Sequence, residues 1–428
     1  MKNFAVGLTI LGCTLLGSCG GVSSNTATSP GDPQPPTQTS QVPRSSIKNL
    51  IVVIMQNSSF DHLFGTFPGA TGLNPSISSY QQVDQAGRTV IPQLLTNPSP
   101  ADVNHTATTY QIAYDSGKMD KYAWENGDQS MDYFDNTITG TATDGKQYGV
   151  STIWGYAQQY ALADNFFASA MASEPSNMLY MVAAEVGPGS DPYGYPQLDG
   201  CSAALLQQNQ SDGATMTPPL TFQNVGDQLS AASLSWTWFH EGFATEQSGQ
   251  CSDYVPQENV FQYFQSTANS SNVQNFKLSD FESLLGSGSL PSVSFITAAP
   301  PHSMHPGAGN IANGIEWLDN LVQAVKSSSA WANTAIIVLW DESGGWYDHV
   351  APPQFSGTIG LGARVPVLVI SPFAKSNYIS HQQMDFVSIL RFIQWNWAVG
   401  QFSDAGQAAR EAQSGDICDL LTTSCAAP

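Results

Sequence analysis

Residues 50–62 read LIVVIMQNSSFDH, the clearest indication in this chain of how it folds. The first five residues form a continuous apolar, β-branched run, which is typical of a parallel strand buried on both faces. Polar side chains follow almost at once, beginning with Gln56 and Asn57. In open α/β sheets, binding sites form at the carboxyl ends of strands. We therefore expect a buried strand over 50–54 with a functional edge after it.

Similar apolar runs recur along the chain and alternate with segments of helical spacing. Further strands are expected at 335–340 and 365–370, with a weaker candidate at 290–296. Helices are expected at 153–170, 177–185, 314–328 and 385–397. This alternation predicts an α/β fold, with a mostly parallel central sheet and helices on both faces. Stretches rich in Gly, Ser and Asn predict loop-rich insertions at about 186–215 and 242–275.

A second polar segment, DESGGWYDHVAPP, follows the apolar run at 335–340. Adjacent carboxylates such as Asp341 and Glu342 repel each other unless a cation lies between them. A hard or borderline metal ion, bound by these carboxylates and by the amide oxygens of Gln56 and Asn57, would remove that repulsion. Alternatively, Asp341 caps a turn and Glu342 is solvated. Two such loops on adjacent strand ends favour a site.

A candidate nucleophile precedes the helix expected at 177–185, in the sequence SEPSN that begins at Ser173. A serine before a helix is most often an N-cap, and this segment alone favours that interpretation. A hydroxyl there also faces free N–H groups and the positive end of the helix dipole. Both favour an alkoxide and the phosphate that it would attack.

The composition excludes several classes of protein. The 428 residues include 13 Lys+Arg and 34 Asp+Glu, and 13 − 34 gives a formal charge of −21. A nucleic-acid partner is therefore not expected, because a basic surface is missing. Hydrophobic residues make up 41% of the chain and aromatic residues 11%, which is enough to build a core.

The N-terminus predicts export. A short cationic start and an apolar segment at 4–16 precede the sequence LGSC, which resembles a bacterial lipoprotein box. The resemblance implies a signal peptide over 1–18, cleavage before Cys19 and lipid attachment to its thiol. An ordinary secretory signal is the alternative. Residues 19–46 then form a flexible, lipid-anchored linker. Gly20 is not the aspartate associated with inner-membrane retention, so we expect an outer-membrane lipoprotein that faces the periplasm or the surface.

Four cysteines remain outside the signal and the anchor, and in an exported protein they predict disulfides. Three pairings of Cys201, Cys251, Cys418 and Cys425 are possible. We favour Cys201–Cys251 and Cys418–Cys425, because the second pair closes a short local loop.

Several segments together resemble a known family. They are the strand followed by QNSSFDH at 56–62, the block at 341–353, the sequence GARVPVLVISP at 362–372, and a weaker set from Asp102 to Asp120. This sequence is similar to the bacterial phosphoesterase family of non-specific phospholipases C and acid phosphatases. That family belongs to the alkaline-phosphatase-like superfamily. The resemblance implies a single phosphoesterase domain over 47–428 with an alkaline-phosphatase-like fold.

The resemblance also implies roles for individual residues. Asn57, Asp341 and Glu342 match metal ligands, and Gln56 stands where the family has a glutamate. An amide oxygen still coordinates a hard cation, but more weakly. One divalent ion is implied, with Ca, Zn, Fe and Mn all open. The histidines that match active-site groups, in contact with the phosphoryl group or protonating the leaving oxygen, are His105, His305 and His349.

Ser173 matches the nucleophile, although one extra residue precedes Asn177, and Ser176 is the reserve. The implied function is metal-assisted hydrolysis of phosphate esters, first as a phospholipase C acting on phospholipid head groups through a phosphoserine. Acid phosphatase activity on small monoesters is the alternative. A catalytically weakened surface binding protein of the same fold is the alternative from another class.

Overall fold

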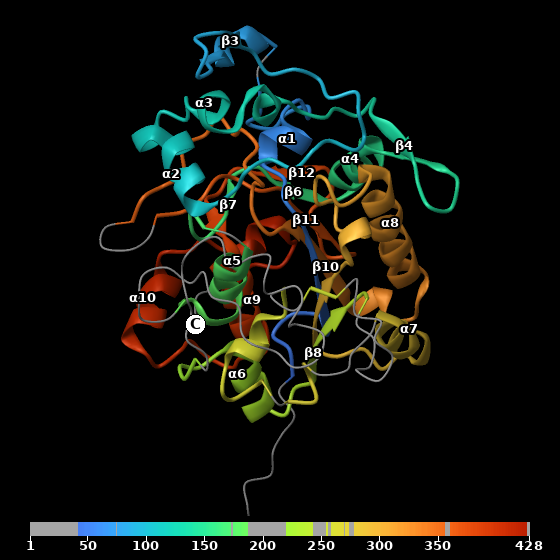
Figure 1. The fold of residues 1–428 in the computed structure, drawn as a ribbon. Helices are drawn as coiled ribbons and strands as arrows, with labels where there is room; N and C mark the ends of the chain where they lie inside the picture. Colours follow the sequence, from blue (N-terminus) through green and yellow to red (C-terminus); the bar gives the residue numbers. More distant parts are fainter. Residues whose placement is uncertain are drawn as a thin grey trace, which may run out of the picture. The chain divides into compact units, whose positions relative to one another are not determined.

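The computed structural model describes residues 42–425, with gaps at 74, 173, 187–219, 243–253, 256–257, 269, 274–277 and 356–359 (Figure 1). Several predictions lie outside these residues. They concern the signal peptide at 1–18, the lipid anchor Cys19, most of the linker, the nucleophile Ser173, and the cysteines Cys201 and Cys251. Among the described residues, none of the helices combines the length and the apolar character needed to cross a membrane.

The described part of the chain contains one large sheet, with the strand order β12-β6-β11-β10-β1-β9-β8. The bounds of these strands are Asn49–Met55 (β1), Ala161–Ala163 (β6), Trp236–His240 (β8), Val293–Thr297 (β9), Thr334–Trp340 (β10), Val367–Ile370 (β11) and Tyr378–Ser380 (β12). β8, β9, β1 and β10 are parallel neighbours, and only β11 runs against the others of this sheet. The predicted α/β fold with a mostly parallel sheet is confirmed.

Helices cover both faces of this sheet (Figure 1). α5 (Glu174–Ala183), α9 (Phe386–Asn396) and α10 (Ala405–Ala412) lie on one side. α4 (Val150–Gln159), α7 (Leu278–Ser287) and α8 (Ile311–Ser327) lie on the other. The remaining α-helices are α1 (Phe60–Phe64), α2 (Ala107–Tyr114), α3 (Tyr122–Asn126) and α6 (Val225–Ala231). The small paired strands are β2 (Gln82–Val83), β3 (Thr89–Val90), β4 (Thr139–Thr141), β5 (Gln147–Gly149), β7 (Phe166–Phe167) and β13 (Met384–Asp385).

The third apolar run forms the one strand of this sheet that runs against its neighbours. The strand expected at 365–370 is found as β11, at 367–370, and it is antiparallel to both β10 and β6. A continuous apolar run reports burial on both faces, and β11 shares this burial with the parallel strands because it lies between β10 and β6. The carboxyl end of β11 therefore lies at the edge opposite to the ends of β1 and β10.

The helix expected over 153–170 is wrong in its second half. α4 ends at Gln159, and the chain continues into β6 and β7. β6 is completely buried and pairs with β11 on one side and β12 on the other. Short buried apolar segments do not distinguish a helix from a strand by their spacing, so pairing within the sheet decides here.

The C-terminal segment is joined by a disulfide between Cys418 and Cys425, whose Cα atoms are 5.8 Å apart. Cys418 is buried in the main core, and Leu421 forms an isolated bridge with Ala374. The short loop closed by these two cysteines therefore attaches the end of the chain to the core beside α9.

Candidate active site

The polar segments that follow β1, β8, β9 and β10 meet at one edge of the sheet. The register of the parallel strands places Met55 beside Trp340, and Thr297 beside both Ile54 and His240. Groups that are 284 residues apart in sequence are thereby brought together, as in the hydrogen bond from the Asn57 N–H to Asp341 Oδ1. The prediction that the exits of β1 and β10 are adjacent agrees with this register.

Asn57 turns the chain sharply at the end of β1. Its φ of +58° lies in the left-handed region, which Asn tolerates better than most residues. In this conformation its backbone N–H donates to Asp341 Oδ1 at 2.8 Å. The Glu342 N–H donates to the same oxygen, also at 2.8 Å. Gly344 lies against Asn57, where an added Cβ would come within 2.6 Å of the Asn57 Cβ.

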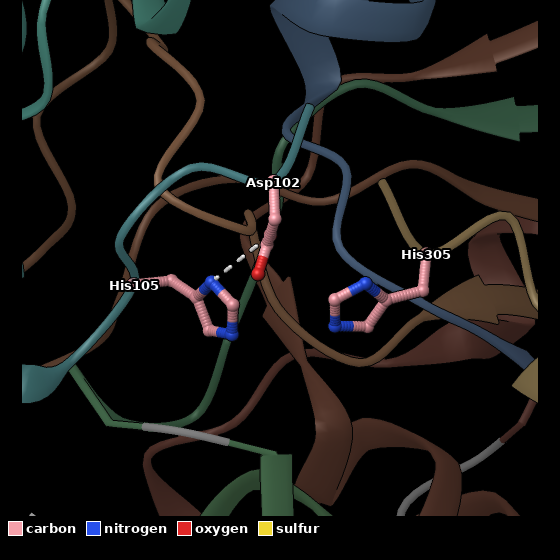
Figure 2. A group of neighbouring side chains, drawn as sticks. All are labelled: Asp102, His105 and His305. Atoms are coloured by element: carbon pink, nitrogen blue, oxygen red, sulfur yellow. Dashed lines mark ion pairs between the residues drawn. The ribbon is translucent and has the colours of Figure 1, made fainter. Parts of the chain in front are cut away.

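Two histidines face Asn57 from separate loops. The Asn57 side-chain nitrogen lies 2.9 Å from His305 Nε2 and 3.4 Å from His105 Nε2. Each Nδ1 is 2.6 Å from a carbonyl of its own loop, which fixes Nδ1–H as the donor and leaves Nε2 as the inward-facing atom. Figure 2 shows the two rings beside Asp102, whose Oδ1 lies 3.6 Å from His105 Nδ1. Burial lowers the pKa of His305, which favours its neutral form.

Two buried carboxylates complete this group, and their charges are poorly compensated. Asp341 and Glu342 are each 1% exposed. Burial, and for Asp341 also the neighbouring Glu342 charge, raises the pKa of Asp341 well above its usual value and that of Glu342 to about 8. Glu342 Oε2 accepts a hydrogen bond from the Tyr110 hydroxyl at 2.7 Å, whereas Asp341 Oδ2 has no partner among the described residues. Such a donor set fits a divalent cation, which would relieve the repulsion and occupy the orphaned oxygen.

Gln56 lies beside this group, in an environment that the sequence did not predict. Its Nε2 donates to Glu258 Oε1 at 2.5 Å and to Glu174 Oε1 at 3.2 Å. Glu258 Oε2 in turn lies 3.0 Å from His240 Nε2. His240 is buried and is the last residue of β8, a strand that the sequence did not predict. No local signal marks Glu258, which lies in a predicted insertion.

His349 lies in a second cluster, built around Asp61. Its Nδ1 is 2.7 Å from Asp61 Oδ2, and its backbone N–H donates to the same oxygen. Burial lowers the pKa of His349, but the Asp61 hydrogen bond and charge outweigh this effect and raise it overall. Arg364, which is fully buried, bonds Asp61 and Asp348 through its guanidinium. Arg364 therefore makes a structural ion pair that supports His349.

The structure describes the residues on both sides of the candidate nucleophile, but not the nucleophile itself. Ser173 lies outside the described residues, and Glu174, the next residue, contacts Gln56. The N-terminus of α5 therefore reaches the group around Gln56. Ser176 lies in the first turn of α5, is 1% exposed, and its Oγ has no hydrogen-bond partner among the described residues.

A cavity of about 800 Å³ is lined by residues that are close in sequence to His105 and His305. Its lining includes Ala101, the neighbour of Asp102, and Gly307, two residues after His305. Gln129, Asp132 and Asn310 contribute polar side chains. Its volume is in the range of sites for small ligands.

The protein is an α/β protein with acidic, amide and imidazole groups at the carboxyl ends of a mostly parallel sheet. Residues 47–400 match the Phosphoesterase family, and the chain belongs to that family. Several relatives carry the name phospholipase C, which is the name of a phosphoric ester hydrolase.

Named relatives agree with this membership. A "Non-hemolytic phospholipase C" of Pseudomonas aeruginosa is 23% identical over 400 residues, covering 82% of this chain and 54% of that protein. A "Phospholipase C A" of Mycobacterium tuberculosis is 24% identical over 402 residues, covering 83% and 74%. The chain thus spans about half the length of the Pseudomonas relative. A solved structure, of a protein in the alkaline phosphatase superfamily from Vibrio parahaemolyticus, aligns over 89% of this chain and 75% of its own, with 11% identity and a TM-score of 0.38.

Proposed function

We propose that the protein hydrolyses phosphate esters, and that its main substrates are phospholipids cleaved at the head group, as in a phospholipase C. The observation that carries this proposal is the convergence of Asp341, Glu342 and Asn57 with two inward-facing imidazoles, His105 and His305. Carboxylates that bind a cation, next to imidazoles that exchange protons, are the groups that phosphoryl transfer requires. The names of the relatives favour phospholipids.

One divalent cation would be held by Asp341, Glu342 and Asn57, with Gln56 beside them. When bound, it polarises the phosphoryl oxygens and favours an ionised nucleophile. The choice among Ca, Zn, Fe and Mn stays open, since oxygen and imidazole donors suit all four.

The groups of the chain carry the remaining steps of the proposed mechanism. The Ser173 hydroxyl loses its proton to water, its oxygen attacks phosphorus in line, and the bond from phosphorus to the leaving alcohol breaks. In its doubly protonated form His105, whose Nδ1 is oriented by Val103 O and Asp102, gives the proton on Nε2 to that alcohol. Water then attacks the phosphoserine and releases the phosphate product. His349, whose pKa is raised by the Asp61 hydrogen bond and charge, offsets negative charge on the phosphoryl oxygens in its protonated form.

The charge of the protein bears on the choice of substrate. A chain with a formal charge of −21 repels anions at long range, so zwitterionic head groups suit it better than strongly anionic ones. The cavity lined by Ala101, Gly307 and Asn310 has room for a small head group.

Turnover by the purified full-length protein in detergent tests this proposal. Phosphatidylcholine, phosphatidylethanolamine and an aryl phosphate monoester would be compared with each divalent cation added. We expect head-group release from the lipids, and a loss of at least about 10³-fold in Ser173→Ala and Asp341→Asn. Ser283→Ala, on the exposed surface of α7, is the control and should keep full activity.

Three outcomes would contradict parts of this proposal. Full activity in Ser173→Ala would exclude that nucleophile and direct attention to Ser176. Turnover of the monoester alone would favour an acid phosphatase. Binding of lipid without turnover of any substrate would favour the catalytically weakened binding protein instead.

We further propose that the protein is an exported lipoprotein, anchored through Cys19, with the outer membrane as its destination. The support is the sequence of residues 1–46, most of which lie outside the described residues. Phase separation in detergent tests it: wild type should enter the detergent phase, and Cys19→Ser should stay in the aqueous phase. Equal partitioning of the two would refute the anchor.

A further inference from the structure

The side-chain amide of Gln56 lies between two carboxylates. Its Nε2 carries two N–H donors, and the two oxygens within reach are Glu258 Oε1 at 2.5 Å and Glu174 Oε1 at 3.2 Å. Because both partners only accept when ionised, the nitrogen end of the amide faces them. The oxygen end of Gln56 is then the end that remains to accept a hydrogen bond or to bind a cation.

Of the two carboxylates, Glu258 is the more deeply buried. It is 1% exposed, whereas Glu174 is only partly buried. Its second oxygen lies 3.0 Å from Nε2 of His240, the last residue of β8. Removing a carboxylate from water is costly, and Glu258 Oε2 has no hydrogen-bond partner among the described residues. A local structural role therefore gives no sufficient reason for an acid at this position.

The groups around Gln56 provide a reason for an acid at position 258. Gln56 is followed in the chain by Asn57, whose N–H bonds Asp341, and the buried Asp341 Oδ2 has no partner among the described residues. Glu258 Oε1 is 2.5 Å from Gln56 Nε2, and the next residue, Asn57, donates its backbone N–H to Asp341 Oδ1. The carboxylate of Glu258 is therefore connected through residues 56 and 57 to the carboxylate that carries the orphaned oxygen.

We propose that Glu258 adds its negative charge to the cation site, and that it holds Gln56 with its amide oxygen available to the cation. Glu258 is thus a positioning residue, which acts on the cation through Gln56. The two residues form one acid–amide pair, with the acid at 258 and the amide at 56. Gln56 is therefore a functional part of the site, and an amide at this position does not indicate a loss of activity. This inference rests on the cation site proposed above.

A swap of the two side chains tests the proposal. Mn²⁺ binding to the full-length protein would be measured by titration calorimetry in wild type, Glu258→Gln, Gln56→Glu and the double variant that combines both changes. We expect Glu258→Gln to weaken Mn²⁺ binding at least about tenfold, as removal of an outer partner of a metal ligand does. The double variant keeps one acid and one amide in contact and should recover most of this loss.

The melting temperature in a chelator provides a second measurement. Gln56→Glu places a third carboxylate against Glu258 and Glu174, so we expect a lower melting temperature without metal. Adding Glu258→Gln should restore it, because the new amide donates to the new acid. The two substitutions are in contact and should be strongly non-additive.

Glu411→Gln is the matched control. Glu411 is another buried glutamate that accepts from a glutamine, Gln394, at 2.7 Å, and its described contacts lie around α9 and α10. The Glu411→Gln substitution should leave the Mn²⁺ affinity of the protein unchanged. Additive effects in the double variant, or wild-type affinity in Glu258→Gln, would overturn the proposal while leaving the cation site intact. No Mn²⁺ binding by the wild type would overturn both.

Discussion

Asn57 shows how one residue serves both the backbone and the site. Its left-handed φ of +58° turns the chain so that its N–H reaches Asp341, and its side chain lies between two imidazoles. Gly344 allows the close approach, since a Cβ there would collide with Asn57. An asparagine suits this position because it tolerates the left-handed region and also provides an amide.

Substitutions at position 57 should separate these two contributions. Asn57→Gly and Asn57→Ala both remove the amide, so both should abolish turnover. Only Ala is strained by the positive φ, so Asn57→Ala should be less stable than Asn57→Gly by about 1 kcal/mol. Urea denaturation measures this difference. At Glu282, exposed on α7, the order should reverse, with Gly less stable than Ala. The same order at both positions would contradict the role given to the backbone of Asn57.

At this scale the sequence predicted the groups that follow β1 and β10 but not their surroundings. Gln56, Asn57, Asp341 and Glu342 were expected together, because parallel strands end at one edge. Glu258 was not expected, because its contact with Gln56 spans 202 residues and depends on how an insertion folds back. A single sequence carries no local signal for such a contact.

Among the elements, α1 is short but holds much of the second cluster. It has five residues, and its N-cap Ser59 accepts from the His62 N–H and donates to Tyr347 O at 2.7 Å. One hydroxyl therefore joins the segment after β1 to the segment after β10. Asp61, within α1, binds His349 and Arg364.

Ser59→Ala should therefore reduce stability noticeably. It removes an N-cap and leaves a buried carbonyl without its donor, and we expect a loss of about 1–2 kcal/mol. Ser283→Ala, in the exposed part of α7, should change stability by less than about 0.5 kcal/mol. Chemical denaturation of both variants measures the two losses of stability. Equal losses would show that Ser59 contributes no more to stability than an exposed serine.

The elements also show where prediction from sequence stops. β1, β9 and β10 and the helices α8 and α9 were found because their apolar spacing is long and regular. The direction of β11, and the change from α4 to β6, depend on neighbours in the sheet that are distant in sequence. Spacing reports which side chains are buried, and pairing decides what they form.

For the whole molecule, the cation site should govern how stability depends on pH. Burial raises the pKa of Glu342 from 4.5 to about 8, and raises those of Asp341 and Glu174 well above their usual values. A carboxyl with a raised pKa stabilises the folded state below its unfolded pKa, and this stability is lost as the pH rises through the folded pKa. His62 has the opposite effect, because burial lowers its pKa from 6.5 to about 3, so it destabilises the fold below about pH 6.5.

Between pH 6.5 and 8, therefore, the melting temperature of the protein in a chelator should fall as the pH rises. A bound divalent cation keeps the carboxylates ionised in the folded state and should remove most of this fall. The raised pKa of His349 also lowers stability as the pH rises, but it belongs to the Asp61 cluster and should persist with the cation. Calorimetric scans with chelator and with Mn²⁺ isolate the part due to the site. Parallel pH profiles in the two conditions would mean that no cation binds these carboxylates.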